Sequence, residues 1–224
     1  MQIQKSTFDF LTELRENNDR SWFNERKPVY LQCLDNSKEV FAEVYNNLIK
    51  HDEIEKQKIY RIYRDIRFSK DKTPYNPRFA TDFTRKGSFN KCDYFLRVKP
   101  NESMIVGGLW MPEKLDLYRL RKEIEFSDKE FRELLSSHNF KKYFGGHFEG
   151  EELKTAPMGF DKHHPAIDLI RKKMFLAIRK FSNEEVLSET FLKEVDKTFK
   201  AMRPFFDLVS DILSTDDNGE SIIS

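Results

Sequence analysis

Residues 92–110, CDYFLRVKPNESMIVGGLW, decide the fold class of this chain. Aromatic and aliphatic residues alternate with polar ones in 92–99, and an apolar run fills 104–110, as expected for β-strands. Between them, PNES contains proline and asparagine, which favour a tight turn. The stretch therefore predicts two strands that pair in antiparallel orientation across a short turn.

Two more segments extend this predicted sheet toward the N-terminus. ATDFTRKG at 80–87 has the composition of a strand, and KIYRIYRDIRFS at 58–69 alternates over a longer distance. A helix is the alternative for 58–69, because Ile59, Ile62 and Ile66 also follow helical spacing. β-branched and aromatic residues dominate the segment and favour the strand. We therefore expect a central antiparallel sheet over roughly residues 58–110.

Helical patterns flank the predicted sheet on both sides. Pro28 suits a first helical turn, and Ser127 and Glu130 have the spacing of a capping box. Pro204 interrupts the apolar stripe of the last helix and should kink it. The order of helices, sheet and helices predicts an α+β fold, with one domain over 1–215 and a flexible tail over 216–224. The expected helices span 7–16, 28–49, 127–136, 165–181 and 188–213.

The composition favours a cytoplasmic protein without cofactor or metal. The chain has 224 residues, of which 38% are hydrophobic and 34% charged, and its 21 phenylalanines can supply a core. We expect no membrane span and no signal peptide, because no apolar run approaches the ~18 residues of a membrane helix. Cys33 and Cys92 are expected to be free and buried, and His163 and His164 to lie at a helix entry rather than on a metal.

The net charge of +1 conceals two oppositely charged segments. Residues 58–86 carry nine lysines and arginines against three aspartates, whereas residues 184–224 carry four basic against ten acidic residues. The two segments could face each other, or the basic one could face an anionic partner.

The stretch RIYRDIRFSKDKTPY at 61–75 holds the candidate site. On the predicted strand Arg61 and Arg67 share a face with Asp65 between them, and arginine suits bidentate recognition of phosphate or carboxylate. Lys72 and Tyr75 could add a point charge and a neutral donor. The alternative is a salt-bridged surface, although exposed ion pairs contribute only ~0–1 kcal/mol each.

Arg64 is assigned a different role from its neighbours. It falls on the opposite face of the predicted strand, with apolar residues, so we expect it to be buried. A buried arginine needs a carboxylate partner, and the pattern therefore predicts a structural ion pair.

The same stretch resembles the signature of the domain-of-unknown-function 2461 family, which is found in bacteria and fungi. The matching residues are Arg61, Arg64, Asp65, Arg67, Phe68, Asp71, Lys72 and Tyr75. NNDRSWF at 17–23, GGLWMP at 107–112 and the spaced pattern from Leu153 to Pro165 are also similar, so the resemblance covers most of the chain. It implies no activity that could be carried over.

Two classes of function are compatible with these residues. The first is binding of a phosphate- or carboxylate-bearing ligand at 61–75, with hydrolysis or group transfer left open and no catalytic residue assigned. The second is a non-catalytic interaction module that docks an acidic protein partner. Aromatic residues among the basic ones also raise single-stranded nucleic acid, but a pI near 7.7 disfavours it. The apolar stripe of 192–213 is expected to pack on the protein's own core, giving a monomer or a weak dimer.

Overall fold

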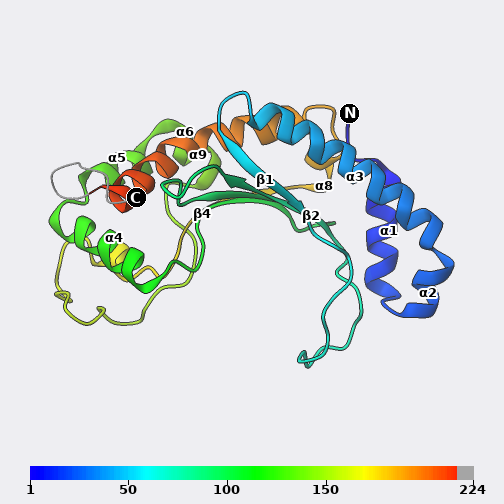
Figure 1. The fold of residues 1–224 in the computed structure, drawn as a ribbon, viewed down its shortest axis with the longest axis horizontal. Helices are drawn as coiled ribbons and strands as arrows, with labels where there is room; N and C mark the ends of the chain where they lie inside the picture. The colour runs from blue at the N-terminus through cyan, green and yellow to red at the C-terminus, as the bar shows by residue number, and fades with distance from the viewer. Residues whose placement is uncertain (216–224) are drawn as a thin grey trace. The chain divides into compact units, whose positions relative to one another are not determined.

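The computed structural model describes residues 1–215, so the expected tail at 216–224 lies outside the described residues. The described chain combines helices with a five-stranded antiparallel sheet of order β1-β2-β3-β4-β5, which confirms the α+β class (Figure 1). The predicted turn joins the third and fourth strands. The strands are β1 Ile54–Ile59, β2 Phe79–Arg85, β3 Asp93–Val98, β4 Ser103–Leu109 and β5 Phe175–Phe181.

Local sequence signals account for several helix boundaries. Asp19 caps α2 by accepting a hydrogen bond from the Trp22 amide, and Pro28 lies in the first turn of α3. The predicted capping box at Ser127 is absent, because Ser127 ends α4 and Asp128 precedes α5. The helices are α1 Lys5–Glu16, α2 Arg20–Glu25, α3 Lys27–Leu48, α4 Lys114–Phe126, α5 Lys129–Ser136, α6 His138–Phe144, α7 Ile167–Ile170, α8 Asn183–Val186 and α9 Phe191–Ser214.

The predicted strand at 58–69 is wrong beyond Ile59. Residues 60–78 instead form a long loop, closed by an isolated bridge between Tyr63 and Tyr75. β1 pairs with β2, and β2 begins only at Phe79. The residues that follow Ile59 therefore have no strand beside them with which to continue the ladder. Pro74 and Pro77 lack the backbone N–H that a continued ladder needs.

The predicted helix at 165–181 is also largely wrong. Only Ile167–Ile170 is helical, and Phe175–Phe181 forms the edge strand β5 beside β4. The backbone of Leu176 also bridges to Glu149. These partners lie far away in sequence, and the pairing overrides the local helical pattern.

The chain divides into two compact units, which we call unit 1 and unit 2. Unit 1 comprises Met1–Phe83, Phe95–Ile105 and Lys180–Lys197, and unit 2 comprises Thr84–Tyr94, Val106–Arg179 and the remainder from Thr198. Strands β2 to β5 and helix α9 contribute residues to both. The expectation of one domain over 1–215 stays a prediction.

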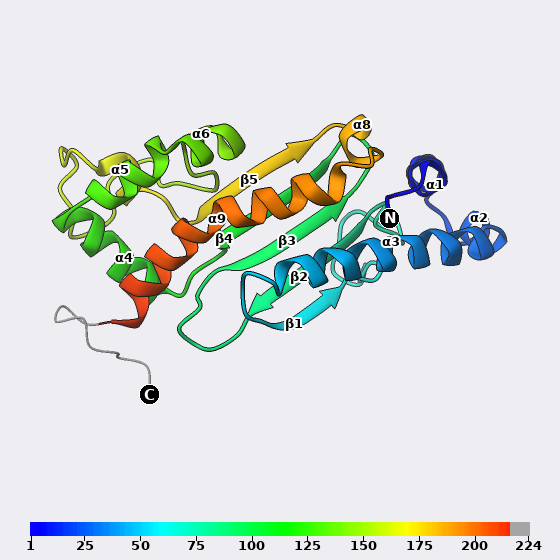
Figure 2. The same cartoon turned by 90° about the horizontal axis from the view of Figure 1, so that it is seen from above.

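Each unit has an apolar core with helix packed on strand. In unit 1, α3 lies along β1 and β2 (Figure 2), and the Gln57 side chain donates to the Phe41 carbonyl of α3 at 3.2 Å. In unit 2, a Cβ added at Gly107 of β4 would lie 2.5 Å from Met202 Sδ of α9. Glycine at this position therefore lets α9 lie close to β4 without displacing side chains. Cys33 and Cys92 are free and buried, as predicted.

Candidate functional site

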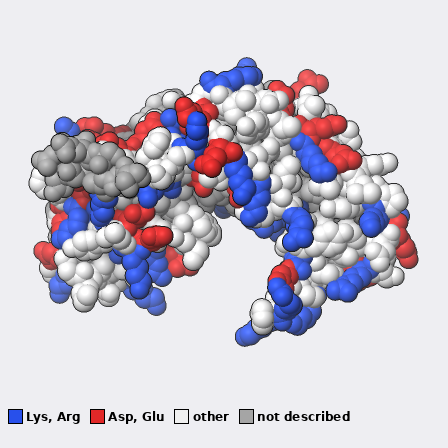
Figure 3. All heavy atoms as spheres, in the orientation of Figure 1, with Lys and Arg blue, Asp and Glu red and all other residues white. Residues whose placement is uncertain are grey.

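The loop 60–78, which contains the candidate site, extends away from β1 and β2 in unit 1 (Figure 1). Figure 3 shows lysine and arginine side chains gathered at its tip. The positions of its side chains decide which of the expected site residues are available to a ligand.

The base of the loop is anchored by an aromatic stack and by an asparagine. The Tyr75 ring lies on the Phe23 ring of α2, with centroids 4.0 Å apart. Asn18 donates to the Tyr75 carbonyl at 3.0 Å and accepts from the Tyr75 amide at 3.1 Å. Its side chain therefore makes the two backbone hydrogen bonds that a neighbouring strand would otherwise make. Tyr75 is only 4% exposed, and burial raises the pKa of its hydroxyl. The structure therefore places this expected ligand donor in an anchoring contact.

Arg64 links the two arms of the loop. Its Nη1 donates to Asp71 Oδ2 at 2.6 Å and to the Thr73 carbonyl at 3.1 Å, and it also contacts the Thr73 hydroxyl. The Thr73 amide and then Arg64 hold the pKa of Asp71 down at about 2. The arginine has the ion-pair partner expected of it, but 60% of the Asp71 side chain is exposed, so the pair lies at the surface of the loop.

Arg67 and Asp65 bind each other at the tip rather than presenting a shared face. Arg67 Nε and Nη2 donate to the two Asp65 carboxylate oxygens at 2.9 and 2.6 Å. This fork holds the pKa of Asp65 below its usual value. The neighbouring Phe68 side chain is 96% exposed, and the Arg67 guanidinium lies 6.0 Å from its ring centroid.

Three cations of the stretch 61–75 within the loop have no carboxylate partner. Lys72 donates to the Ile66 carbonyl at 3.0 Å, and Arg61 and Lys70 are exposed to solvent. Within residues 1–215 neither the loop nor the acidic C-terminal segment supplies a salt bridge to any of the three. Lys70 was not singled out from the sequence, although its position between Arg67 and Lys72 pointed to it.

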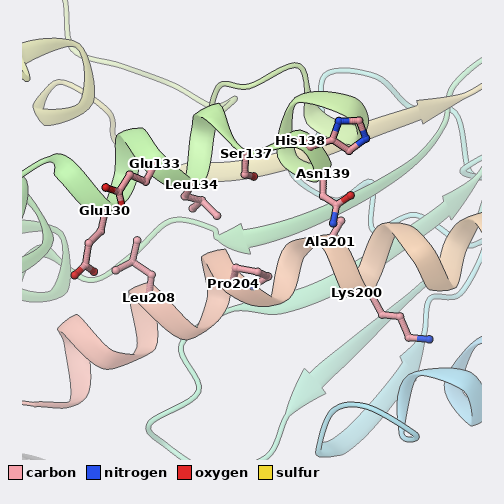
Figure 4. Close-up of a pocket in the computed structure, with 10 residues that line it drawn as sticks. All are labelled: Glu130, Glu133, Leu134, Ser137, His138, Asn139, Lys200, Ala201, Pro204 and Leu208. Atoms are coloured by element: carbon pink, nitrogen blue, oxygen red, sulfur yellow. The ribbon is translucent and has the colours of Figure 1, made fainter.

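A separate pocket of about 470 Å³ lies in unit 2, between helices α5 and α6 on one side and α9 on the other (Figure 4). Leu134, Pro204 and Leu208 form its apolar part, and two glutamates of α5 lie at its rim. The pocket was not predicted from the sequence. The one signal for it was Pro204 within a predicted helix, and this proline is exposed in the structure. The lining residues are Glu130, Glu133, Leu134, Ser137, His138, Asn139, Lys200, Ala201, Pro204 and Leu208.

The histidines lie where helix entry predicts them. His163 and His164 belong to the turn before α7, and His164 Nδ1 accepts from the Ala166 amide at 3.1 Å. Residues 1–215 hold no group of three or more histidine, cysteine or acidic side chains placed to bind a metal ion. Nor does any helix in this part of the chain have the length and apolar character to cross a membrane.

Comparisons with known proteins agree with the resemblance in the loop and its anchor. Neither the curated proteins nor the solved structures contain a match to this chain. The family model described as "Conserved hypothetical protein (DUF2461)" matches residues 6–208, which include the Asn18 anchor and the whole loop. The chain therefore belongs to the DUF2461 family.

Proposed function

We propose that this protein binds a phosphate- or carboxylate-bearing ligand through the loop 60–78. One observation carries the proposal: the two aspartates of 61–75 are occupied by Arg64 and Arg67, whereas Arg61, Lys70 and Lys72 have no carboxylate partner. Unpaired cations that share one exposed loop repel one another, and a bound anion offsets that repulsion.

The contacts within the loop suit binding because they fix its shape before a ligand arrives. Arg64 joins the two arms, and the Phe23–Tyr75 stack holds the base. A preformed loop loses less conformational entropy on binding than a flexible one. Arg67, already oriented by Asp65, keeps guanidinium N–H donors that do not bind Asp65 and that can bind a ligand oxygen.

The ligand suggested by this geometry is an anionic group carried on a larger molecule. The cations sit on a projecting loop, where a small anion would stay largely hydrated and weakly held. The loop contains neither histidine nor cysteine. We therefore assign it binding and attach no turnover to it.

An acidic protein partner is the second candidate, and Phe68 is the observation that favours it. A phenylalanine that is 96% exposed beside an arginine is a typical anchor of a protein interface. Both candidates use the same cations. They are distinguished by whether polyphosphate or polyglutamate binds more tightly.

Binding is measured with polyphosphate and with polyglutamate, using thermal shift and fluorescence anisotropy at two salt concentrations. The loop variant replaces Arg61, Lys70 and Lys72 by Gln, and the control replaces the exposed Lys27, Lys162 and Lys193 by Gln, which removes the same charge. We expect the loop variant to lose most of the affinity and the control to keep it. Equal affinities of the two variants, or no binding by the unmodified protein, would contradict the proposal.

A further inference from the structure

Six side chains of unit 1 share the face of the strands that is opposite α3, which we call the open face. The Gln57 side chain donates to the Thr81 hydroxyl at 3.4 Å and to the α3 backbone, so these two residues define the face toward the helix. Strand side chains alternate, so their neighbours in sequence point the other way. The open face consists of Lys58, Tyr60, Arg78, Asp82, Phe95 and Arg97.

Contacts join four of these side chains, Lys58, Tyr60, Asp82 and Phe95, into one group. The Tyr60 hydroxyl donates to Asp82 Oδ2 at 2.7 Å, and the Tyr60 and Phe95 rings meet edge to face with centroids 6.1 Å apart. Lys58 Nζ lies 4.8 Å from the Tyr60 ring centroid. Lys58 is exposed and the other five are half-buried, so solvent reaches this face.

The two arginines of the open face are incompletely neutralised. Arg97 donates to the Glu102 carbonyl at 3.0 Å, but its guanidinium is 3.8 Å from the Glu102 carboxylate, which Lys99 holds at 2.6 Å. Arg78 is half-buried, and no salt bridge or side-chain hydrogen bond reaches its guanidinium within residues 1–215. Burial lowers the pKa of Arg97, and the positive charge of Arg78 lowers it further, so the two guanidinium groups repel each other.

Among the six side chains of the open face, the carboxylate of Asp82 is already engaged. Asp82 accepts the Tyr60 hydroxyl, whose pKa is raised to about 12 by burial and by this hydrogen bond. A stable sheet does not need two half-buried arginines that repel each other, because exposed or half-exposed charge adds little to stability. An external anion that binds both arginines would offset this repulsion.

We propose that Arg78 and Arg97 bind a phosphate group on the open face, with Lys58 adding a third positive charge. A guanidinium presents two parallel N–H donors to a phosphate, and two such groups can hold one dianion from both sides. The half-buried rings of Tyr60 and Phe95 offer an apolar surface to whatever carries the phosphate. Tyr60 and Arg78 stand at the two ends of the loop 60–78, but the proposed function rests on Arg61, Lys70 and Lys72, and none of these belongs to the open face. This proposal and the proposed function therefore fail separately.

The decisive experiment uses inorganic pyrophosphate as the probe and Arg78→Gln as the variant. We expect Arg78→Gln to weaken pyrophosphate binding at least about tenfold by calorimetry, and Arg78→Lys to give an intermediate affinity. Without ligand, the melting temperature of Arg78→Gln should equal or exceed that of the unmodified protein, because one repelling charge is gone. The loop variant should bind pyrophosphate at the open face normally.

Two results would overturn the site. One is pyrophosphate affinity unchanged by Arg78→Gln or absent altogether. The other is a lower melting temperature for ligand-free Arg78→Gln, which would show a structural role. A mononucleotide and a short single-stranded oligonucleotide distinguish the source of the phosphate. If the mononucleotide binds more tightly than pyrophosphate and Arg78→Gln abolishes that gain, the carrier is a free nucleotide. If only the oligonucleotide shows this gain, the carrier is a polymer.

Discussion

Arg64 and Arg67 lie three residues apart in the same loop, yet their surroundings give them different energetic weight. The Arg64 side chain is 21% exposed and bonds to both arms of the loop, whereas that of Arg67 is 77% exposed and bonds only within the tip. We expect Arg64→Ala to cost about 1–2 kcal/mol and to lower the melting temperature by about 2–8 °C. Arg67→Ala should leave the melting temperature unchanged, which thermal unfolding by circular dichroism checks.

Arg64→Lys is the matched control, since it keeps the charge but its side chain ends one bond short of the position from which Arg64 Nη1 reaches both Asp71 and the Thr73 carbonyl. It should recover only part of the lost stability. A larger effect of Arg67→Ala than of Arg64→Ala would mean that the tip, and not the junction of the two arms, holds the loop in shape.

At this scale the sequence predicted charge pairing better than burial, since Arg64 was expected to be buried and its side chain is 21% exposed. Arg64 was expected to meet a carboxylate and does, because Asp71 lies within the same short stretch. The burial of Tyr75 depends on Phe23 and Asn18, which are more than fifty residues away. No local sequence pattern shows such a contact. Tyr75 was therefore predicted to be an exposed hydrogen-bond donor, although it is a buried aromatic residue.

The strand β4 depends on its two adjacent glycines, and they should not respond alike to substitution. A Cβ at Gly107 would meet the ends of the Met202 and Phe206 side chains, which can move. Gly108 has a φ of +131°, and a Cβ there would collide with the backbone carbonyl of Phe175 in β5. We expect Gly107→Ala to cost about 1–3 kcal/mol and Gly108→Ala about 3–5 kcal/mol, by denaturant unfolding.

The substitution Gly159→Ala offers a control, because it adds a methyl group at another positive φ where no atom lies within 4 Å. Its cost isolates the backbone strain from the collision. If Gly108→Ala were no worse than Gly159→Ala, β5 would not pack against β4 as closely as the structure has it.

Elements that pair with sequence neighbours were predictable, and those that pair at a distance were not. The β3–β4 hairpin and α9 follow from local alternation, turn residues and helical spacing. The segment 58–69 has the alternation of a strand, but the opposite arm of the loop contains Pro74 and Pro77 and does not form a partner strand. β5 has a partner, β4, that lies beyond α4 to α7 in the chain. Alternation shows that a segment can form a strand, and only the fold decides whether a neighbour is present.

At the scale of the whole molecule, an ion pair of a buried arginine joins the basic segment to the acidic one. Arg85 is 4% exposed and pairs with Asp207 of α9 at 3.3 Å within unit 2. The cations of the loop and of the open face have no such partner in α9 among residues 1–215. A near-neutral total charge is therefore compatible with a locally cationic surface, and the pI of 7.7 does not argue against anion binding.

The position of the apolar stripe of α9 bears on the expected oligomeric state. Leu192, the first residue of the expected stripe, is half-buried. The other six are each 0–1% exposed, namely Val195, Phe199, Met202, Phe206, Val209 and Leu213. The stripe is thus covered by the chain itself, and a partner helix has no apolar seam to join. We expect a monomer or a weak dimer in sedimentation velocity at micromolar concentration.

Phe199→Glu tests this explanation, because it places a charge in the core between Tyr94 and the rest of α9. A fully buried, unpaired carboxylate costs more than the ~3–5 kcal/mol of losing the ring, which is a large share of a typical domain's stability. The variant should therefore unfold or melt far below the unmodified protein. Lys193→Glu, which changes an exposed position on the same helix, should remain folded. A tight dimer that Phe199→Glu converts into a folded monomer would show instead that the stripe is an interface, and that α9 detaches from its own core to form it.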